Sequence, residues 1–178
     1  PLALAERLRA RLQPPAAPRD EARLAWPSGD IGFSLFVAQW PDLTIEVPAA
    51  QLYTRYAVLG ADGVLRAERH GKGAFCYGPY LNLPAGRYRV RIFGEAAAGA
   101  EYTARVACSV EDRKSVPVCE KRYVRDGRSS GAIAELVFAS DIELRNFEVV
   151  VTATSRSAAI AVAALAITGA GLRPDPES

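Results

Sequence analysis

The feature that most constrains the fold of this chain is a strict two-residue alternation in residues 86–93. Three arginines occupy every second position, and large apolar residues lie between them. The arginines are Arg87, Arg89 and Arg91, and the apolar residues are Tyr88, Val90 and Ile92. Because successive side chains of a β-strand point to opposite faces of its sheet, this pattern predicts a strand with one solvated face and one buried face. A helix would spread the arginines around its circumference instead.

Turn residues flank this strand on its N-terminal side. In Leu83-Pro84-Ala85-Gly86 the proline presets φ and the glycine supplies a positive φ, so we expect a turn there. We place Pro79 at the start of the preceding strand, where a missing N–H does least harm. A second alternating run covers residues 102–110, and the glycine-containing link before it predicts a hairpin with residues 86–93.

Further short runs of strand-forming residues follow one another along the chain. They cover residues 31–37, 43–47, 121–124, 132–138, 147–153 and 158–168. The last run is rich in alanine, which favours a helix, but its length and its flanking serine and glycine residues favour a buried strand. Eight to ten short strands predict an all-β fold, an antiparallel β-sandwich of the jelly-roll type.

The N-terminal segment has a different pattern. Leu4, Leu8 and Leu12 are spaced by four, which predicts a short N-terminal helix with one apolar face. A Pro/Ala-rich linker follows, so we divide the chain into a helix and linker (1–20), a sandwich (21–172) and a frayed tail (173–178). A helix this short needs a partner, and we expect residues 1–13 to contact a neighbouring domain or a second copy.

Composition excludes several classes of function. The formal net charge of +2 argues against nucleic acid or an anionic membrane surface as a partner. No apolar run reaches 18 residues, so no membrane span is expected. The three cysteines do not indicate a disulfide framework; a Cys108 to Cys119 bridge across a loop is left open, with three buried or half-buried free thiols as the simpler interpretation.

The string YGPYLNLPAGRYRVRIFGE (residues 77–95) resembles bacterial jelly-roll domains of the galactose-binding-like, carbohydrate-binding-module type, which accompany surface polysaccharide proteins. The matching features are an aromatic-Gly-Pro-Tyr start, a Leu-Pro-Ala-Gly turn and a Gly-Arg-Tyr-x-Val strand. The closing residues 146–151 (NFEVVV) look similar as well. The resemblance implies a sugar-binding sandwich within a larger bacterial protein, in the cytoplasm or at the cell surface, and does not indicate which glycan.

Sugar recognition needs an aromatic ring that stacks on the C–H face of a pyranose, and polar groups that pair with its hydroxyls. Residues of both kinds gather around the glycine-rich segment 70–80, which we expect to be a loop, and before the strand at 147–153. The candidate ligand-binding residues are Trp40, His70, Lys72, Tyr77, Tyr80, Arg145 and Asn146. The competing interpretation is ordinary packing for the tryptophan and tyrosines, and a surface loop for the histidine.

Enzyme motifs are missing from the sequence. There is no Gly-x-Ser-x-Gly elbow, phosphate-binding loop or zinc motif, so we expect a non-catalytic module without a cofactor; a structural calcium stays unassigned. Candidate carboxylates such as Glu135 and Glu148 are expected to be solvated charges on strand exteriors. Two alternatives stay open: a protein–protein or oligomerisation module, and a polysaccharide-active enzyme whose carboxylates converge only in space.

Overall fold

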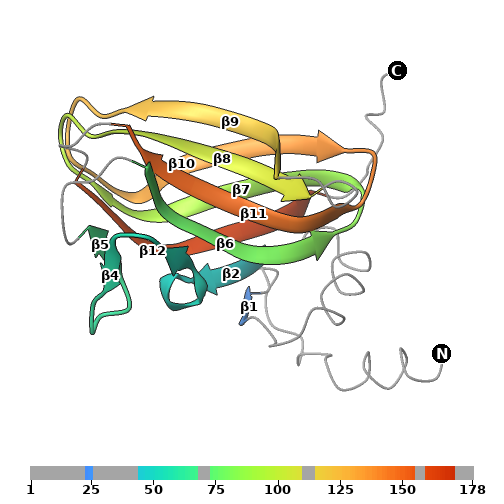
Figure 1. The fold of residues 1–178 in the computed structure, drawn as a ribbon, viewed down its shortest axis with the longest axis horizontal. Helices are drawn as coiled ribbons and strands as arrows, with labels where there is room; N and C mark the ends of the chain where they lie inside the picture. Colours follow the sequence, from blue (N-terminus) through green and yellow to red (C-terminus); the bar gives the residue numbers. More distant parts are fainter. Residues whose placement is uncertain (1–22, 26–43, 68–72, 110–114, 155–158, 171–178) are drawn as a thin grey trace, which may run out of the picture.

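Two packed β-sheets contain most of the residues that the computed structural model describes, which are 23–25, 44–67, 73–109, 115–154 and 159–170 (Figure 1). The predicted all-β sandwich is therefore confirmed. The predicted N-terminal helix and linker (1–20), the predicted strand at 31–37 and the tail at 173–178 lie outside the described residues. No helix in the described part of the chain is long and apolar enough to cross a membrane.

The seven-stranded sheet is centred on β7 and β12, which pair with each other along most of their length. Its strands are β1 (Arg23–Ala25), β2 (Thr44–Pro48), β4 (Ala57–Leu59), β5 (Leu65–Ala67), β7 (Gly86–Ala96), β10 (Ser129–Ser140) and β12 (Ile160–Ala170). β10 pairs with the other side of β7, while β2 and β5 pair with the other side of β12. The pairing of β1 with β2 is parallel, and the other pairings of this sheet are antiparallel.

The five-stranded sheet has the order β3-β6-β11-β8-β9 and is antiparallel among the described strands. Its strands are β3 (Tyr53–Thr54), β6 (Gly73–Leu83), β8 (Glu101–Ser109), β9 (Val116–Val124) and β11 (Leu144–Ala153). A single 3-10 turn, η1 (Ala49–Gln51), connects β2 to β3 and thereby leads the chain from one sheet to the other. Figure 1 shows β6, β11, β8 and β9 as one layer in front of β7, β10 and β12.

The alternation of apolar and polar residues correctly predicted which side chains of these strands lie in the core. On β7 the apolar residues between the arginines are buried, and the arginines lie on the outer face. The inner faces of β8 and β11 follow the same period, and the alanine-rich run 158–168 is the strand β12. The largest fully buried side chains come from both sheets: Tyr102, Phe75, Phe147, Leu65, Leu83, Ile92, Ile133, Leu136, Leu165, Ile167, Val47 and Val90. Apolar burial between the two sheets is the main stabilising contribution to the sandwich.

The predicted hairpin between residues 86–93 and 102–110 is wrong. β7 pairs with β10 and β12, whereas β8 pairs with β9 and β11, so the link between them crosses from one sheet to the other. The turn before β7 also joins opposite sheets, and the Tyr88 hydroxyl stabilises it by donating to the Pro84 carbonyl at 2.5 Å. Alternation reports which face of a strand is buried but not which strand lies beside it, and a glycine-containing link serves either geometry.

Residues 70–80 do not form a loop as a whole, because β6 begins at Gly73 and continues to Leu83. Pro79 therefore lies within the strand rather than at its start, after a cis peptide bond from Gly78. The pairing of β6 with β11 shifts register at three points, and such bulges tolerate a residue without an N–H. The same bulges interrupt the period of two, which is why the sequence pattern of this strand was hidden.

One further expectation is corrected at β9, and one open alternative is decided there. The strand extends over Val116–Val124, well beyond the expected 121–124, because its mostly exposed side chains carry no apolar alternation. Cys108 and Cys119 are both free thiols, as is Cys76, so no disulfide joins the ends of this loop. The simpler interpretation is confirmed for all three cysteines, because Cys76 and Cys108 are buried and Cys119 is half-buried.

Side chains of the five-stranded sheet cover the free edge of β10. The Tyr123 hydroxyl donates to the carbonyl of Glu135 at 2.6 Å and accepts from the N–H of the same residue at 2.9 Å. One step along the edge, Tyr102 donates to the Ile133 carbonyl at 2.6 Å, and Arg125 donates to the same oxygen. These contacts fasten the two sheets along one side and occupy backbone groups that another strand could otherwise use.

Candidate functional site

Three tyrosines contact one another on the outer face of the five-stranded sheet. Tyr53 and Tyr77 are register partners on β3 and β6, and their rings stack with centroids 5.7 Å apart. Tyr80 lies further along β6, with its ring 5.5 Å from that of Tyr53 and 6.4 Å from that of Tyr77. Tyr53 is 55% exposed and Tyr80 38% exposed. We call these three residues the tyrosine patch.

The backbone of β6 positions these rings. Cys76 points into the core, so its neighbour Tyr77 points outward. Gly78 has φ 117°, and a Cβ there would approach the Tyr53 ring to 3.3 Å, so the glycine leaves room for the ring. Tyr80 has φ 63°, a left-handed conformation that costs energy for a residue with a side chain. Such strain is characteristic of residues held in place by their surroundings at functional sites.

A buried carboxylate lies beside the tyrosine patch. Glu148 on β11 is the register partner of Pro79, faces outward, and is only 8% exposed. Its Oε1 accepts a hydrogen bond from the Ser115 hydroxyl at 2.6 Å, and the carboxylate also bonds the Tyr80 hydroxyl. Burial, together with the negative charge of Glu148 and this bond, raises the pKa of Tyr80 to about 12. The expected solvated position of Glu148 is therefore wrong.

The predicted residues Arg145 and Asn146 lie near the start of β11, next to β6. The Asn146 backbone has φ 47°, and its N–H donates to the Asn82 Oδ1 at 3.0 Å. The Arg145 guanidinium is exposed and lies 3.6 Å from the Glu143 carboxylate, so its described contact is with that residue and not with a tyrosine. Tyr77, Tyr80, Arg145 and Asn146 thus lie on two neighbouring strands.

Trp40, His70 and Lys72 lie outside the described residues. Tyr53, Ser115 and Glu148 join the candidate site although the predicted set does not contain them. Tyr53 reaches it because β3, only two residues long, pairs with β6, and Glu148 because β11 pairs with β6 on the other side. Cross-strand register decides these neighbours, and a single sequence carries no direct signal for it.

The tyrosine patch continues as a row of side chains across the whole outer face. Register partners run in order Tyr53, Tyr77, Val150, Arg105 and Glu120, one from each strand. The Nε of Arg105 is buried and has no hydrogen-bond partner. The row therefore presents aromatic rings at one end and charged groups at the other.

Charged clusters elsewhere are satisfied by their own neighbours. Glu135 accepts a bond from Arg91 at 2.8 Å and lies 4.0 Å from Arg89, and these contacts lower its pKa. The arginine row on β7 is thus partly neutralised and solvated. The other ion pairs on the seven-stranded sheet are also exposed arginine–carboxylate pairs.

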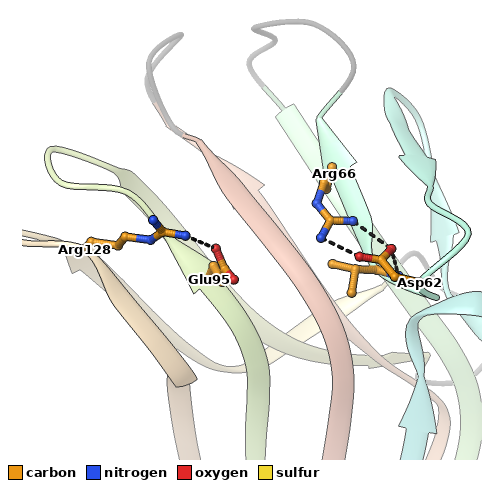
Figure 2. A network of polar contacts seen from close by, with 5 residues as sticks. Asp62, Arg66, Glu95 and Arg128 are labelled. Carbon is orange, nitrogen blue, oxygen red and sulfur yellow. Dashed lines mark hydrogen bonds and ion pairs between the residues drawn. The ribbon is translucent and has the colours of Figure 1, made fainter.

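Figure 2 shows two of those pairs. Arg66 donates two hydrogen bonds, of 2.8 and 2.7 Å, to the two oxygens of Asp62, and this contact lowers the Asp62 pKa to about 2. Arg128 donates to Glu95 at 2.7 Å. Exposed pairs of this kind contribute little to stability. Within the described ranges, no group of three or more His, Cys, Asp or Glu side chains is placed to hold a metal ion.

Among known proteins, similarity to this chain is found with solved structures. No protein-family model matches the chain, and no curated protein matches it. A structure described as the Glycosylation Associate Protein (Gap123) complex from Streptococcus agalactiae is similar over 71% of this chain, with 11% sequence identity and a TM-score of 0.49. The matched region is 25% of that chain, so the present sequence corresponds to about a quarter of its length.

Proposed function

We propose that this chain is a non-catalytic carbohydrate-binding module that holds a glycan against the tyrosine patch. The observation that carries the proposal is the exposure of two mutually contacting tyrosine rings, 55% for Tyr53 and 38% for Tyr80, on the outer face of the five-stranded sheet. Exposed rings in contact offer apolar faces to the C–H groups of a pyranose, while their hydroxyls can pair with sugar hydroxyls. A sheet holds such rings in place before binding, which lowers the entropy lost on association.

The extent of the outer face suits a chain of sugars. Five strands at a spacing of about 4.8 Å separate the outermost members of the cross-strand row by about 19 Å. That span accommodates a short oligosaccharide lying across the strands, with Tyr53 and Tyr77 at one end and Arg105 and Glu120 at the other. The resemblance of residues 77–95 to galactose-binding-like domains is a further reason for proposing that this face binds sugar.

The surroundings of the carboxylates support a binding role over a catalytic one. Glycoside cleavage uses two carboxyl groups that flank the scissile bond. Glu148 is buried and bonded to two hydroxyls, whereas Glu143, which precedes β11, lies against Arg145. An interaction module that uses residues 1–13 stays a separate prediction, because those residues lie outside the described ranges.

The proposal is tested by titrating neutral, acidic and amino-bearing oligosaccharides against the chain, using NMR shift changes and calorimetry. We expect binding in the micromolar to millimolar range, and a loss of about tenfold or more in Tyr53→Ala and Tyr80→Ala. Val58→Ala, which trims an exposed side chain on the seven-stranded sheet, is the matched control and should bind normally. Absence of binding to every glycan at millimolar concentration, or equal binding by the tyrosine variants, would contradict the proposal.

A further inference from the structure

Glu148 is a buried carboxylate whose described partners are both uncharged. Ser115 and Tyr80 each supply a hydroxyl, and no ion pair joins Glu148 to a lysine or arginine among the described residues. The exposed Glu135 and Glu95 each have an arginine within 2.8 Å. Glu148 is thus the most buried carboxylate among the described residues, and none of those residues forms an ion pair with it.

This arrangement has an energetic cost. Removing a carboxylate from water is unfavourable, and hydroxyl donors offset only part of that cost when no cation is near. Arg105 is the nearest arginine by register, since it pairs with Val150, two residues beyond Glu148 on the same face. Its guanidinium nevertheless makes no ion pair with Glu148, and its buried Nε has no partner. A bound cation would therefore gain a charge interaction that the described residues leave unmade.

A ligand can reach this carboxylate from the surface. Ser115 is exposed and Tyr80 is 38% exposed, so both hydroxyls that cover Glu148 belong to side chains at the solvent boundary. A carboxylate accepts about four hydrogen bonds, and two described donors leave capacity for more. The Tyr80 ring that bonds Glu148 also contacts the other two rings of the patch. A group bonded to Glu148 would therefore lie beside aromatic faces.

We infer that the tyrosine patch selects glycans that carry a free, protonated amino group. The inference rests on the proposed function and specifies its ligand class. The ammonium group would donate to Glu148 and supply a counter-charge that the described residues do not provide, while the sugar ring lies against the tyrosines. An aromatic face also attracts a cation directly. A neutral hydroxyl or an N-acetyl group can make a hydrogen bond at this position but cannot neutralise the carboxylate.

Two polymers that differ only in this group provide the test. Glucosamine oligomers and N-acetylglucosamine oligomers of equal length are titrated against the wild-type chain at constant pH and low salt. We expect the amino-bearing oligomer to bind about tenfold more tightly, with the difference shrinking as salt is raised. Glu148→Gln keeps the shape of the side chain but removes its charge, so it should abolish this preference and bring the affinities for the two oligomers close together.

Glu143→Gln is the matched control, because it removes an exposed carboxylate from the same end of the five-stranded sheet and should keep the preference. Equal affinity for the two oligomers, binding only to glycans without amino groups, or a preference that survives Glu148→Gln would each overturn the inference and leave the tyrosine patch as a glycan site. If no glycan binds, and Tyr53→Ala changes nothing, the proposed function fails as well.

Discussion

At the scale of single residues, Tyr80 and Glu148 depend on each other. Tyr80 adopts a left-handed backbone conformation, and its hydroxyl bonds a carboxylate that faces outward but is largely covered. Glu148 is buried but does not belong to the apolar core, and the Ser115 hydroxyl bonds it as well. Its ionised carboxylate in turn disfavours ionisation of Tyr80, because two negative charges would lie side by side.

The first prediction concerns that coupling. Glu148→Gln should lower the pKa of Tyr80 from about 12 towards the ordinary tyrosine value of about 10, because it removes the negative charge. Part of the elevation should remain, since burial is its largest cause. An NMR titration of ¹³C-labelled tyrosine measures the shift, with Glu143→Gln as control. An unchanged Tyr80 titration in Glu148→Gln would show that Glu148 is not its electrostatic partner.

The second prediction concerns Gly94 on β7. A Cβ at this position would overlap the carbonyl of Ala161 on β12, where the pairing of the two strands shifts register. Gly94→Ala should therefore destabilise the chain by about 3 kcal/mol, measured by denaturant unfolding. Gly127 has open space around its Cβ position, so Gly127→Ala should change stability by less than about 0.5 kcal/mol. Equal stability of the two variants would contradict the close approach of β7 and β12.

At the scale of elements, the sequence predicted strands well where the apolar period was uninterrupted. β7, β8 and β11 carry clear inner faces, and each was found. β12 was found from its length and flanking residues instead. β6 was mistaken in part for a loop because its bulges interrupt the alternation. Pairing was the weaker part of the prediction, since β7 and β8 both show the right alternation yet lie in opposite sheets.

The third prediction concerns the edge of β10. Tyr123→Phe removes the hydroxyl that bonds both the N–H and the carbonyl of Glu135. We expect a loss of about 1 kcal/mol in unfolding free energy and faster hydrogen exchange of the Glu135 amide. Tyr56→Phe, which removes a hydroxyl bond to the Gly73 carbonyl, is the control and should leave that amide unchanged. Undiminished protection of Glu135 in Tyr123→Phe would mean that Tyr123 does not cover this edge.

At the scale of the whole molecule, the candidate site depends on the assembly of the five-stranded sheet. Tyr77 and Tyr80 could be selected from sequence because they stand beside Gly78 and Pro79 in an aromatic-rich segment. The position of Tyr53 and Glu148 beside them could not be predicted, because these residues are distant in the chain and become neighbours through β3 and β11. The types of residue in a sequence indicate part of the chemistry of a site. Which residues lie together in that site is decided by the order of the strands.

The fourth prediction concerns alkaline pH. Burial, first among the causes, raises the pKa values of Tyr80 and Tyr88 to about 12, and it raises those of Tyr56, Tyr102 and Tyr123 as well. In the unfolded chain these groups ionise near pH 10. Their contribution to stability is therefore fully present below about pH 10 and is lost as pH rises through about 12.

Denaturant unfolding between pH 8 and pH 12 measures this loss as a falling midpoint. Tyr88→Phe removes one of the groups and should make the decline shallower, while Arg128→Gln at an exposed ion pair should leave its slope unchanged. A midpoint that stays constant up to pH 12 would show that these tyrosines ionise equally easily in the folded and unfolded chain.

The position of β12 has a consequence for the synthesis of the protein. β12 is the last described strand, yet it lies inside the seven-stranded sheet, between β7 and the early strands β2 and β5 (Figure 1). A ribosome releases β2, β5 and β7 long before it releases β12, so these strands leave the exit tunnel without the partner that joins them. Until then their apolar faces and unpaired backbone are exposed to other nascent chains and to chaperones. The seven-stranded sheet can therefore close only after translation of this segment is complete.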